Sequence, residues 1–261
     1  MGVEIDIDSD YVMAVRVGSI DTAELLAIHD ELAPKRRSWT MVPIFGEKPI
    51  DYRTNTRFYA VNEKTQHGMY RIMAPIKETA DYNLAVRDET GLEPWDDHML
   101  GLWKRVEDVA RSVTALLGIP DSRLNNRMDF DIMFRGFVHD HVSPGNNWHT
   151  DKDKAVCINI PLLYNEDDYV RFTDVGNIKD KGRSELEPAY QKFCEEHTPF
   201  YEYKYSYIKD GQQSVGILKT HTVHRVGFSE NNLDKRVILT LAFKQTMYDA
   251  IRGFVQNAAN K

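Results

Sequence analysis

The sequence predicts an α+β protein with a mainly β core, built as a double-stranded β-helix (jelly roll) that N-terminal helices buttress. Two observations support this class. Apolar residues recur at helical spacing in two segments before residue 124, and from residue 127 the apolar period changes towards two. We expect one domain over residues 1–261, with a helical and irregular support (1–124), a jelly-roll core (125–247) and a C-terminal helix (248–261).

Two helices are predicted in the N-terminal half. Residues 21–32 begin with possible capping residues, carry apolar side chains at three- and four-residue steps, and stop before Pro34. A second stripe of apolar residues runs from Asp96 to Leu117 and ends at Gly118. Residues 38–75 between them are broken by prolines, so we expect outer strands or a substrate-facing loop there.

The second half of the chain carries the strand signals. Side chains alternate between apolar and polar from Arg127 to Gly136, as in a strand with one face on a core. A buried strand at 155–160 should close at Pro161, and Asp210-Gly211 is a hairpin-type turn. Further strands are predicted at 201–207, 214–218, 222–228 and 237–243.

Two segments stand apart from this series. The insert 165–198 is rich in Asp, Lys and Glu and shows no strand pattern; we interpret it as a solvated crossover, with a helix-containing lid as the alternative. Residues 248–255 have the spacing of a short last helix.

Composition limits the classes of function. The chain has no apolar run long enough to cross a membrane and no secretory signal pattern at its start, so the expected location is cytoplasmic. Its 2 cysteines predict free thiols. A net charge of −7 makes nucleic acid an unfavourable partner and leaves a small-molecule substrate as the expectation. The oligomeric state is undetermined by the sequence.

A metal site is indicated by His149 and Asp151. Residues i and i+2 of a strand share a face, so both side chains can bind one ion. His224, far along the chain, could complete the site, with His221 as a competitor and Asp153 competing with Asp151. Two imidazoles and one carboxylate with vacant positions suit Fe(II).

Arg236 is the candidate anion clamp. It follows His224 by about a dozen residues, after a predicted hairpin turn, so that it could lie on the same pocket wall as that histidine. Its guanidinium could bind the far carboxylate of a keto acid. The alternative is a surface ion pair with Glu230 or Asp234.

The order His149-x-Asp151, long gap, His224, Arg236 resembles that of the Fe(II)- and 2-oxoglutarate-dependent dioxygenases, over roughly residues 127–246. The resemblance implies iron on those three ligands, with 2-oxoglutarate and O2 as cosubstrates and succinate and CO2 as products. Hydroxylation of an amino-acid-like or other small molecule is the expected outcome. The same order favours His224 over His221.

One departure from that pattern concerns the keto acid. In several branches a Ser or Thr follows the arginine by two residues, whereas this chain has Ile238. Another donor is needed, and the candidates are Asn125, Arg127 and Asn159. Trp148 and Arg225 are candidate substrate contacts.

Two rival functions remain open. His139 and His141 resemble a cupin His-x-His pair, although no Glu follows them closely, and would make the chain a cupin-like metalloenzyme. The other rival is a non-enzymatic β-sandwich binding protein with a structural or lost metal site.

Overall fold

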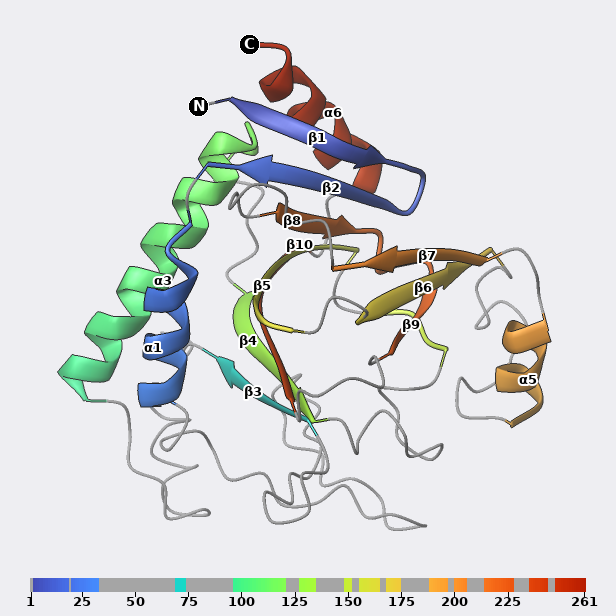
Figure 1. The fold of residues 1–261 in the computed structure, drawn as a ribbon, viewed down its shortest axis with the longest axis horizontal. Coiled ribbons are helices and arrows are strands. Elements are labelled where there is room, and N and C mark those ends of the chain that lie inside the picture. The colour runs from blue at the N-terminus through green and yellow to red at the C-terminus, as the bar shows by residue number, and fades with distance from the viewer. Residues whose placement is uncertain are drawn as a thin grey trace.

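The structure is a computed structural model (Figure 1) that describes residues 2–18, 20–32, 69–73, 96–120, 127–134, 148–151, 155–164, 168–174, 188–196, 200–205, 214–227, 235–243 and 247–261. Helices and antiparallel sheets combine in these residues, which confirms the α+β class. The helices are α1 (Thr22–Leu32), α3 (Asp97–Leu116), α5 (Pro188–Glu196) and α6 (Tyr248–Ala259).

The strands form two sheets. The larger has the order β1 (Val3–Asp8), β2 (Val12–Val17), β8 (Ser214–Leu218), β5 (Val156–Leu163), β10 (Lys235–Phe243), β4 (Arg127–Phe134) and β3 (Met69–Met73). The smaller has the order β7 (Phe200–Lys204), β6 (Tyr169–Thr173) and β9 (Val223–Gly227). In Figure 1, α1 and α3 lie on one side of the larger sheet, α6 lies beside β1, and α5 lies beyond the smaller sheet.

The central strands β2, β8, β5 and β10 of the larger sheet are buried on both faces. Along β10, Leu239 and Leu241 belong to the core that α1, α3 and α6 cover, whereas Ile238 belongs to a second core with Phe172 and Tyr203 of the smaller sheet. Successive strand residues point to opposite faces, so a strand covered on both sides becomes a continuous apolar run. The side chains of this second core fill the space between the two sheets.

Gly216 on β8 makes room for an aromatic side chain in this space. A Cβ built on Gly216 would lie 2.9 Å from the hydroxyl oxygen and 3.0 Å from Cε1 of Tyr203. Tyr203 is buried, with 1% of its surface exposed, so its ring has little freedom to move aside. The absence of a side chain at Gly216 sets how closely the sheets approach here.

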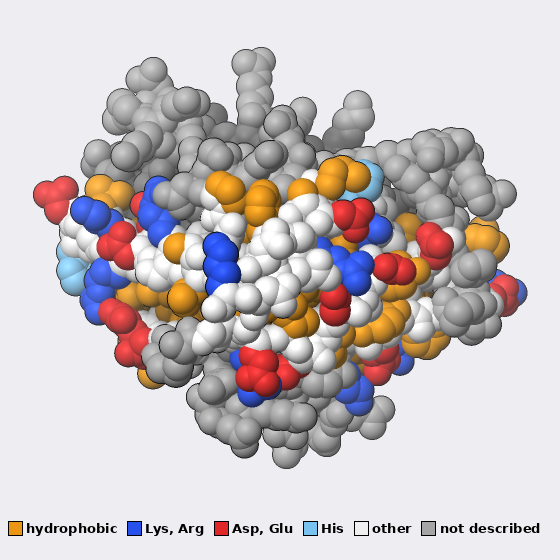
Figure 2. Space-filling model, turned by 90° about the horizontal axis from the view of Figure 1, so that it is seen from above, with side chains coloured by type: hydrophobic (Ala, Val, Ile, Leu, Met, Phe, Trp, Pro, Cys, Tyr) orange, Lys and Arg blue, Asp and Glu red, His pale blue; other side chains and the backbone are white. Residues whose placement is uncertain are grey.

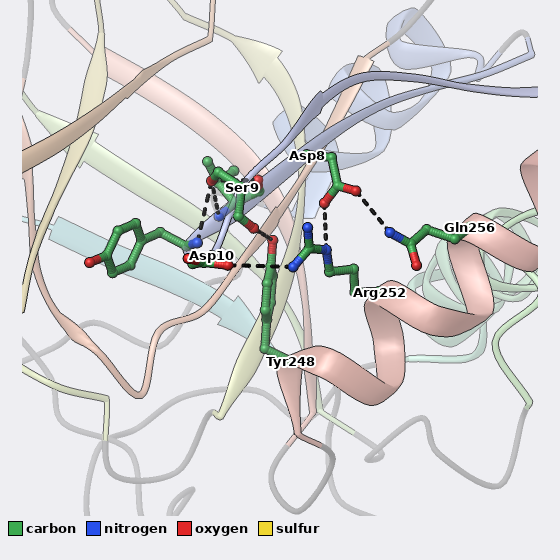
Figure 3. Close-up of polar contacts among 8 residues, drawn as sticks. Asp8, Ser9, Asp10, Tyr248, Arg252 and Gln256 are labelled. Carbon is green, nitrogen blue, oxygen red and sulfur yellow. Dashed lines mark hydrogen bonds and ion pairs between the residues drawn. The ribbon is translucent and has the colours of Figure 1, made fainter.

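The C-terminal helix is attached to the β1–β2 hairpin by polar contacts (Figure 3). Asp8 forms an ion pair with Arg252 at 2.5 Å and accepts a hydrogen bond from Gln256 at 2.8 Å, and the Tyr248 hydroxyl donates to the Ser9 carbonyl at 2.9 Å. Burial raises the pKa of Tyr248, which keeps that donor protonated. The two ends of the chain are thus joined along one edge of the fold.

The face around α6 and β1 carries mixed charge. Figure 2 shows basic and acidic side chains interspersed over it. The acids of β1 alternate with half-buried apolar residues, and Arg16 on β2 pairs with Glu4 and Asp6. Neighbouring opposite charges leave this face without a large field of one sign. No helix among the described residues is long and apolar enough to span a membrane.

Several sequence predictions are confirmed and others are wrong. Both N-terminal helices, the last helix and the strands near 127, 155, 201, 214, 222 and 237 are present. No strand was predicted before the first helix, whereas the structure has the hairpin β1–β2 there. The alternation of apolar residues and acids over 3–8 is itself a strand signal, with the acids on the exposed face of β1, and it was overlooked.

Two further corrections concern local structure. The segment 165–198 contains β6 and α5, so its lack of a strand pattern was misleading. Residue 161 does not close β5, which continues to Leu163; Pro161 lies opposite Ile238, where the register with β10 shifts. A bulge tolerates proline because one ladder hydrogen bond is already missing there. The predicted turn at 210–211 lies outside the described residues.

We expect Gly216→Ala to destabilise the protein by about 1–3 kcal/mol, because the added methyl group overpacks against Tyr203. Gly101 on α3 is the matched control: it has no atom within 4 Å of a built Cβ, and Gly101→Ala should stabilise by about 0.5–1 kcal/mol through helix propensity. Urea unfolding measures both. Equal effects of the two changes would contradict this account of the sheet spacing.

Candidate metal centre

His149 and His224 are held opposite each other by their backbones. The amide of each donates to the carbonyl of the other, with both N···O distances 2.8 Å. They form an isolated antiparallel bridge, and directly opposed residues in such a pair project their side chains to the same face. The two imidazole centroids lie 4.5 Å apart.

Asp151 completes a group of three ligand atoms. One ligand atom each from His149, Asp151 and His224 lie within 4.8 Å of one another. The Asp151 amide donates to the Thr220 carbonyl at 3.0 Å, which keeps this segment against the strand that carries His224. Side chains two residues apart then share a face, as the His-x-Asp spacing predicts. His224 is buried, and the other two are half-buried.

A backbone carbonyl sets the tautomer of His224. Its Nδ1 lies 2.9 Å from the carbonyl oxygen of Thr222. A carbonyl can only accept, so Nδ1 must carry the proton and the lone pair is on Nε2. Histidine ligands in metal sites commonly donate their other N–H to a carbonyl in this way, which fixes the ring and raises its basicity.

The structure also distinguishes between His221 and His224, the two histidines that compete as the distal ligand. His221 is exposed, and its backbone amide donates to the Ala155 carbonyl, whereas His224 is 4% exposed and lies in the group of ligand atoms. The structure therefore brings together the residues that the sequence favoured. Asp153, the competitor of Asp151, lies outside the described residues.

Arg236 faces the space between the sheets. It lies on the same face of β10 as Ile238, is 5% exposed, and has its guanidinium carbon 5.5 Å from the centroid of the Tyr205 ring. His224 faces the same space from the smaller sheet, because it pairs with Phe172 and their rings lie 5.9 Å apart. Both side chains therefore border the second core.

The predicted hairpin pairing around Arg236 was wrong. The strand β9, which carries His224, pairs with β6, whereas β10 pairs with β4 and β5. The chain crosses between sheets after His224 instead of returning beside it. Arg236 consequently lies on the wall opposite His224, a placement that strand spacing alone could not distinguish from a hairpin.

A chain of hydrogen bonds adjoins Arg236. The Thr240 hydroxyl donates to Asn159 Oδ1 at 3.1 Å, and Asn159 Nδ2 donates to the Tyr205 hydroxyl at 3.1 Å. Because that oxygen accepts from Asn159, the Tyr205 proton is directed to another acceptor. Buried amides are normally hydrogen-bonded, so the sequence could indicate Asn159, but nothing in the spacing pointed to Tyr205.

Trp148 and Arg225 lie on the side of their segments that faces away from the three candidate ligands. Trp148 is 1% exposed and packs with Val223 and α5, and the Arg225 guanidinium lies 5.1 Å from its ring centroid. Arg225 follows His224 and therefore points to the opposite face of β9. Among the described residues, these two contact α5 and not the space between the sheets.

The remaining candidates lie wholly or partly outside the described residues. Arg127 is in β4 with its backbone opposite Ala242, and its side chain is outside the description. Asn125, His139 and His141 also lie outside the described residues.

No protein-family model matches this sequence, and no curated protein matches it. Among solved structures, the chain is similar to AviO1 from Streptomyces viridochromogenes Tue57, with 14% identity, a TM-score of 0.39 and 91% of both chains covered. It is also similar to SnoN, a non-heme alpha-ketoglutarate-dependent epimerase from nogalamycin biosynthesis, with 13% identity, a TM-score of 0.31, and 88% of this chain and 76% of that chain covered. Likeness at this level does not establish a shared fold.

We expect His149→Ala and His224→Ala each to abolish tight binding of Co(II), a spectroscopic substitute for Fe(II), because each removes one of three ligands. His221→Ala should bind Co(II) as the unchanged protein does, since His221 is exposed and outside the ligand group. Anaerobic titration followed by visible absorption measures this. Loss of binding in His221→Ala with retention in His224→Ala would contradict the assignment.

Proposed function

We propose that this protein is an Fe(II)- and 2-oxoglutarate-dependent oxygenase on a jelly-roll core. The observation that carries the proposal is the convergence of His149, Asp151 and His224, with their ligand atoms within 4.8 Å of one another. The donor set fits the metal: two imidazoles and one carboxylate are the facial triad of non-heme Fe(II) oxygenases. The fixed Nδ1 proton of His224 supports metal ligation by its Nε2.

Iron at this triad would supply the activation of O2 that oxidises the substrate while 2-oxoglutarate is converted to succinate and CO2. The protein's contribution is to bind and orient. The triad leaves one positive charge of Fe(II) uncompensated, which favours an anionic chelating ligand. Buried apolar residues beside His224, such as Phe172, would limit the access of water to that side of the site.

Arg236 is the residue we assign to the distal carboxylate of 2-oxoglutarate. It is buried, permanently charged, and borders the same space as His224 from the opposite sheet. A guanidinium can donate two parallel hydrogen bonds to a carboxylate, and such charge-assisted pairs are the stronger kind.

Tyr205 is our candidate for the second donor, in place of the Ser or Thr that Ile238 replaces. Its ring lies against Arg236, and Asn159 fixes its hydroxyl oxygen as an acceptor. A phenol hydroxyl can donate to an anion held beside a guanidinium. Asn159 would act through Tyr205 and not by direct contact.

The substrate we propose is an amino-acid-like or other small molecule, with hydroxylation as the reaction. The net charge of −7 and the mixed charge of the face in Figure 2 favour a small molecule over a nucleic acid. The proposed location is cytoplasmic.

The direct experiment measures succinate released from 2-oxoglutarate in air with added Fe(II). A variant that lacks Asp151 (Asp151→Ala) should release none, because the remaining two imidazoles no longer complete the triad. The same proteins are compared anaerobically for the visible charge-transfer band of iron-bound 2-oxoglutarate. Neither succinate nor this band with the unchanged protein would refute the proposed function.

Arg236→Gln should raise the apparent KM for 2-oxoglutarate, since losing a charge-assisted hydrogen bond costs about 1.5–3 kcal/mol, or roughly 10- to 150-fold. Tyr205→Phe should raise it by a smaller factor, because it removes a neutral donor. Arg16→Gln is the matched control, because Arg16 pairs with Glu4 and Asp6 on the β1–β2 hairpin. An unchanged KM in Arg236→Gln would remove Arg236 from the binding of 2-oxoglutarate.

A further inference from the structure

Gln191 on α5 binds both backbone groups of the residue before His149. The Trp148 amide donates to Gln191 Oε1 at 2.7 Å, and Gln191 Nε2 donates to the Trp148 carbonyl at 2.9 Å. A side-chain carboxamide thus takes the place that a neighbouring strand would occupy. The segment 148–151 is paired with β9 at His149 on one side and bound by this glutamine at the residue before.

Glu195, one helical turn after Gln191, joins the two metal-binding segments. One of its oxygens accepts from Trp148 Nε1 at 3.1 Å, and the other pairs with Arg225 at 2.5 Å. Trp148 precedes His149 and Arg225 follows His224. A single carboxylate is therefore bonded to the chain neighbours of both histidines.

An apolar contact reinforces these bonds. Tyr190 and Cys194 of α5 form a buried cluster with Trp148 and Val223. Val223 and Arg225 flank His224 and point to the opposite face of β9. Helix α5 consequently lies behind the metal centre, with its contacts on the side away from the three ligand atoms.

We infer that α5 is a clamp that positions the metal ligands, with Gln191 and Glu195 as positioning residues. The inference rests on the proposed function, because it assigns these bonds to the ligands of that site. His149 and His224 are joined by an isolated bridge of two backbone hydrogen bonds, and so short a pairing is only marginally stable without further contacts. The clamp adds bonds from a third element to both bridged segments, at the end of the bridge where Trp148 and Arg225 lie together.

The contributions of the two residues differ. The side chain of Glu195 is 47% exposed, so solvent screens its ion pair with Arg225. Its hydrogen bond to the Trp148 indole therefore contributes more to holding the two segments together. Gln191 binds backbone atoms directly and is half-buried. We therefore expect Gln191 to matter more for the position of His149, and Glu195 to matter more for keeping the two segments together.

The first test needs no metal. In Gln191→Ala and Glu195→Ala, hydrogen exchange at the amides of Trp148, His149 and His224 should become faster, while amides of β5 and β10 keep their protection. Glu196→Ala is the matched control: Glu196 is the next residue of the same helix, is exposed, and pairs with Lys192. It should leave exchange at all of these amides unchanged. Unchanged exchange in both clamp variants would overturn the inference.

The second test measures Co(II) affinity anaerobically. Removing groups that orient metal ligands weakens metal binding by about 10- to 100-fold, so we expect at least a tenfold loss in each clamp variant and none in Glu196→Ala. Glu195→Gln keeps an acceptor for the Trp148 indole and should recover part of the affinity. Thermal unfolding of each variant separates a local effect from loss of the whole fold, and exchange confined to the three amides supports the local effect.

The outcomes distinguish the two proposals. If the unchanged protein binds no Co(II), the proposed metal function fails, and the role of α5 as a positioning element for ligands fails with it, whatever the exchange data show. If the unchanged protein binds Co(II) and the clamp variants bind it equally well, the inference about α5 fails and the proposed function stands.

Discussion

The pair of backbone hydrogen bonds between His149 and His224 is the constraint on which the candidate site depends. It brings together two segments that are 75 residues apart in the chain and orients both imidazoles to one face. Asp151 follows from this pairing, because its spacing from His149 places it on the same face. The Thr222 carbonyl then selects the nitrogen of His224 that is available to a metal.

The central strands of the larger sheet are buried on both faces, and the candidate site lies beside one of these faces. One face packs on helices, and the other faces the smaller sheet. The space between the sheets contains His224, Arg236 and Tyr205, contributed by three different strands and their ends. A charged residue such as Arg236 is costly to bury unless anions or polar groups accompany it, so its position identifies a polar end of this space.

Helix α5, between β6 and β7, lies behind the candidate metal centre. It contacts Trp148 and Arg225, the chain neighbours of the two histidines, and covers the face of β9 that points away from the ligands. Functional side chains require support from residues that hold their backbones in place. In this chain that support comes from a polar insert, and its composition resembles that of an ordinary surface loop.

The sequence by itself determined the α+β class and the main elements, and it predicted the three residues that the structure brings together. Helical and alternating periodicities identify α3, β4 and β10, and the spacing of His149 and Asp151 requires only that the segment be extended. The tertiary structure decided which strands pair. It placed β9 and β10 in different sheets, revealed strands in acidic or polar segments, and brought Tyr205 beside Arg236. Periodicity reports which face of a strand is buried, whereas pairing depends on contacts between residues distant in the chain, which local spacing does not encode.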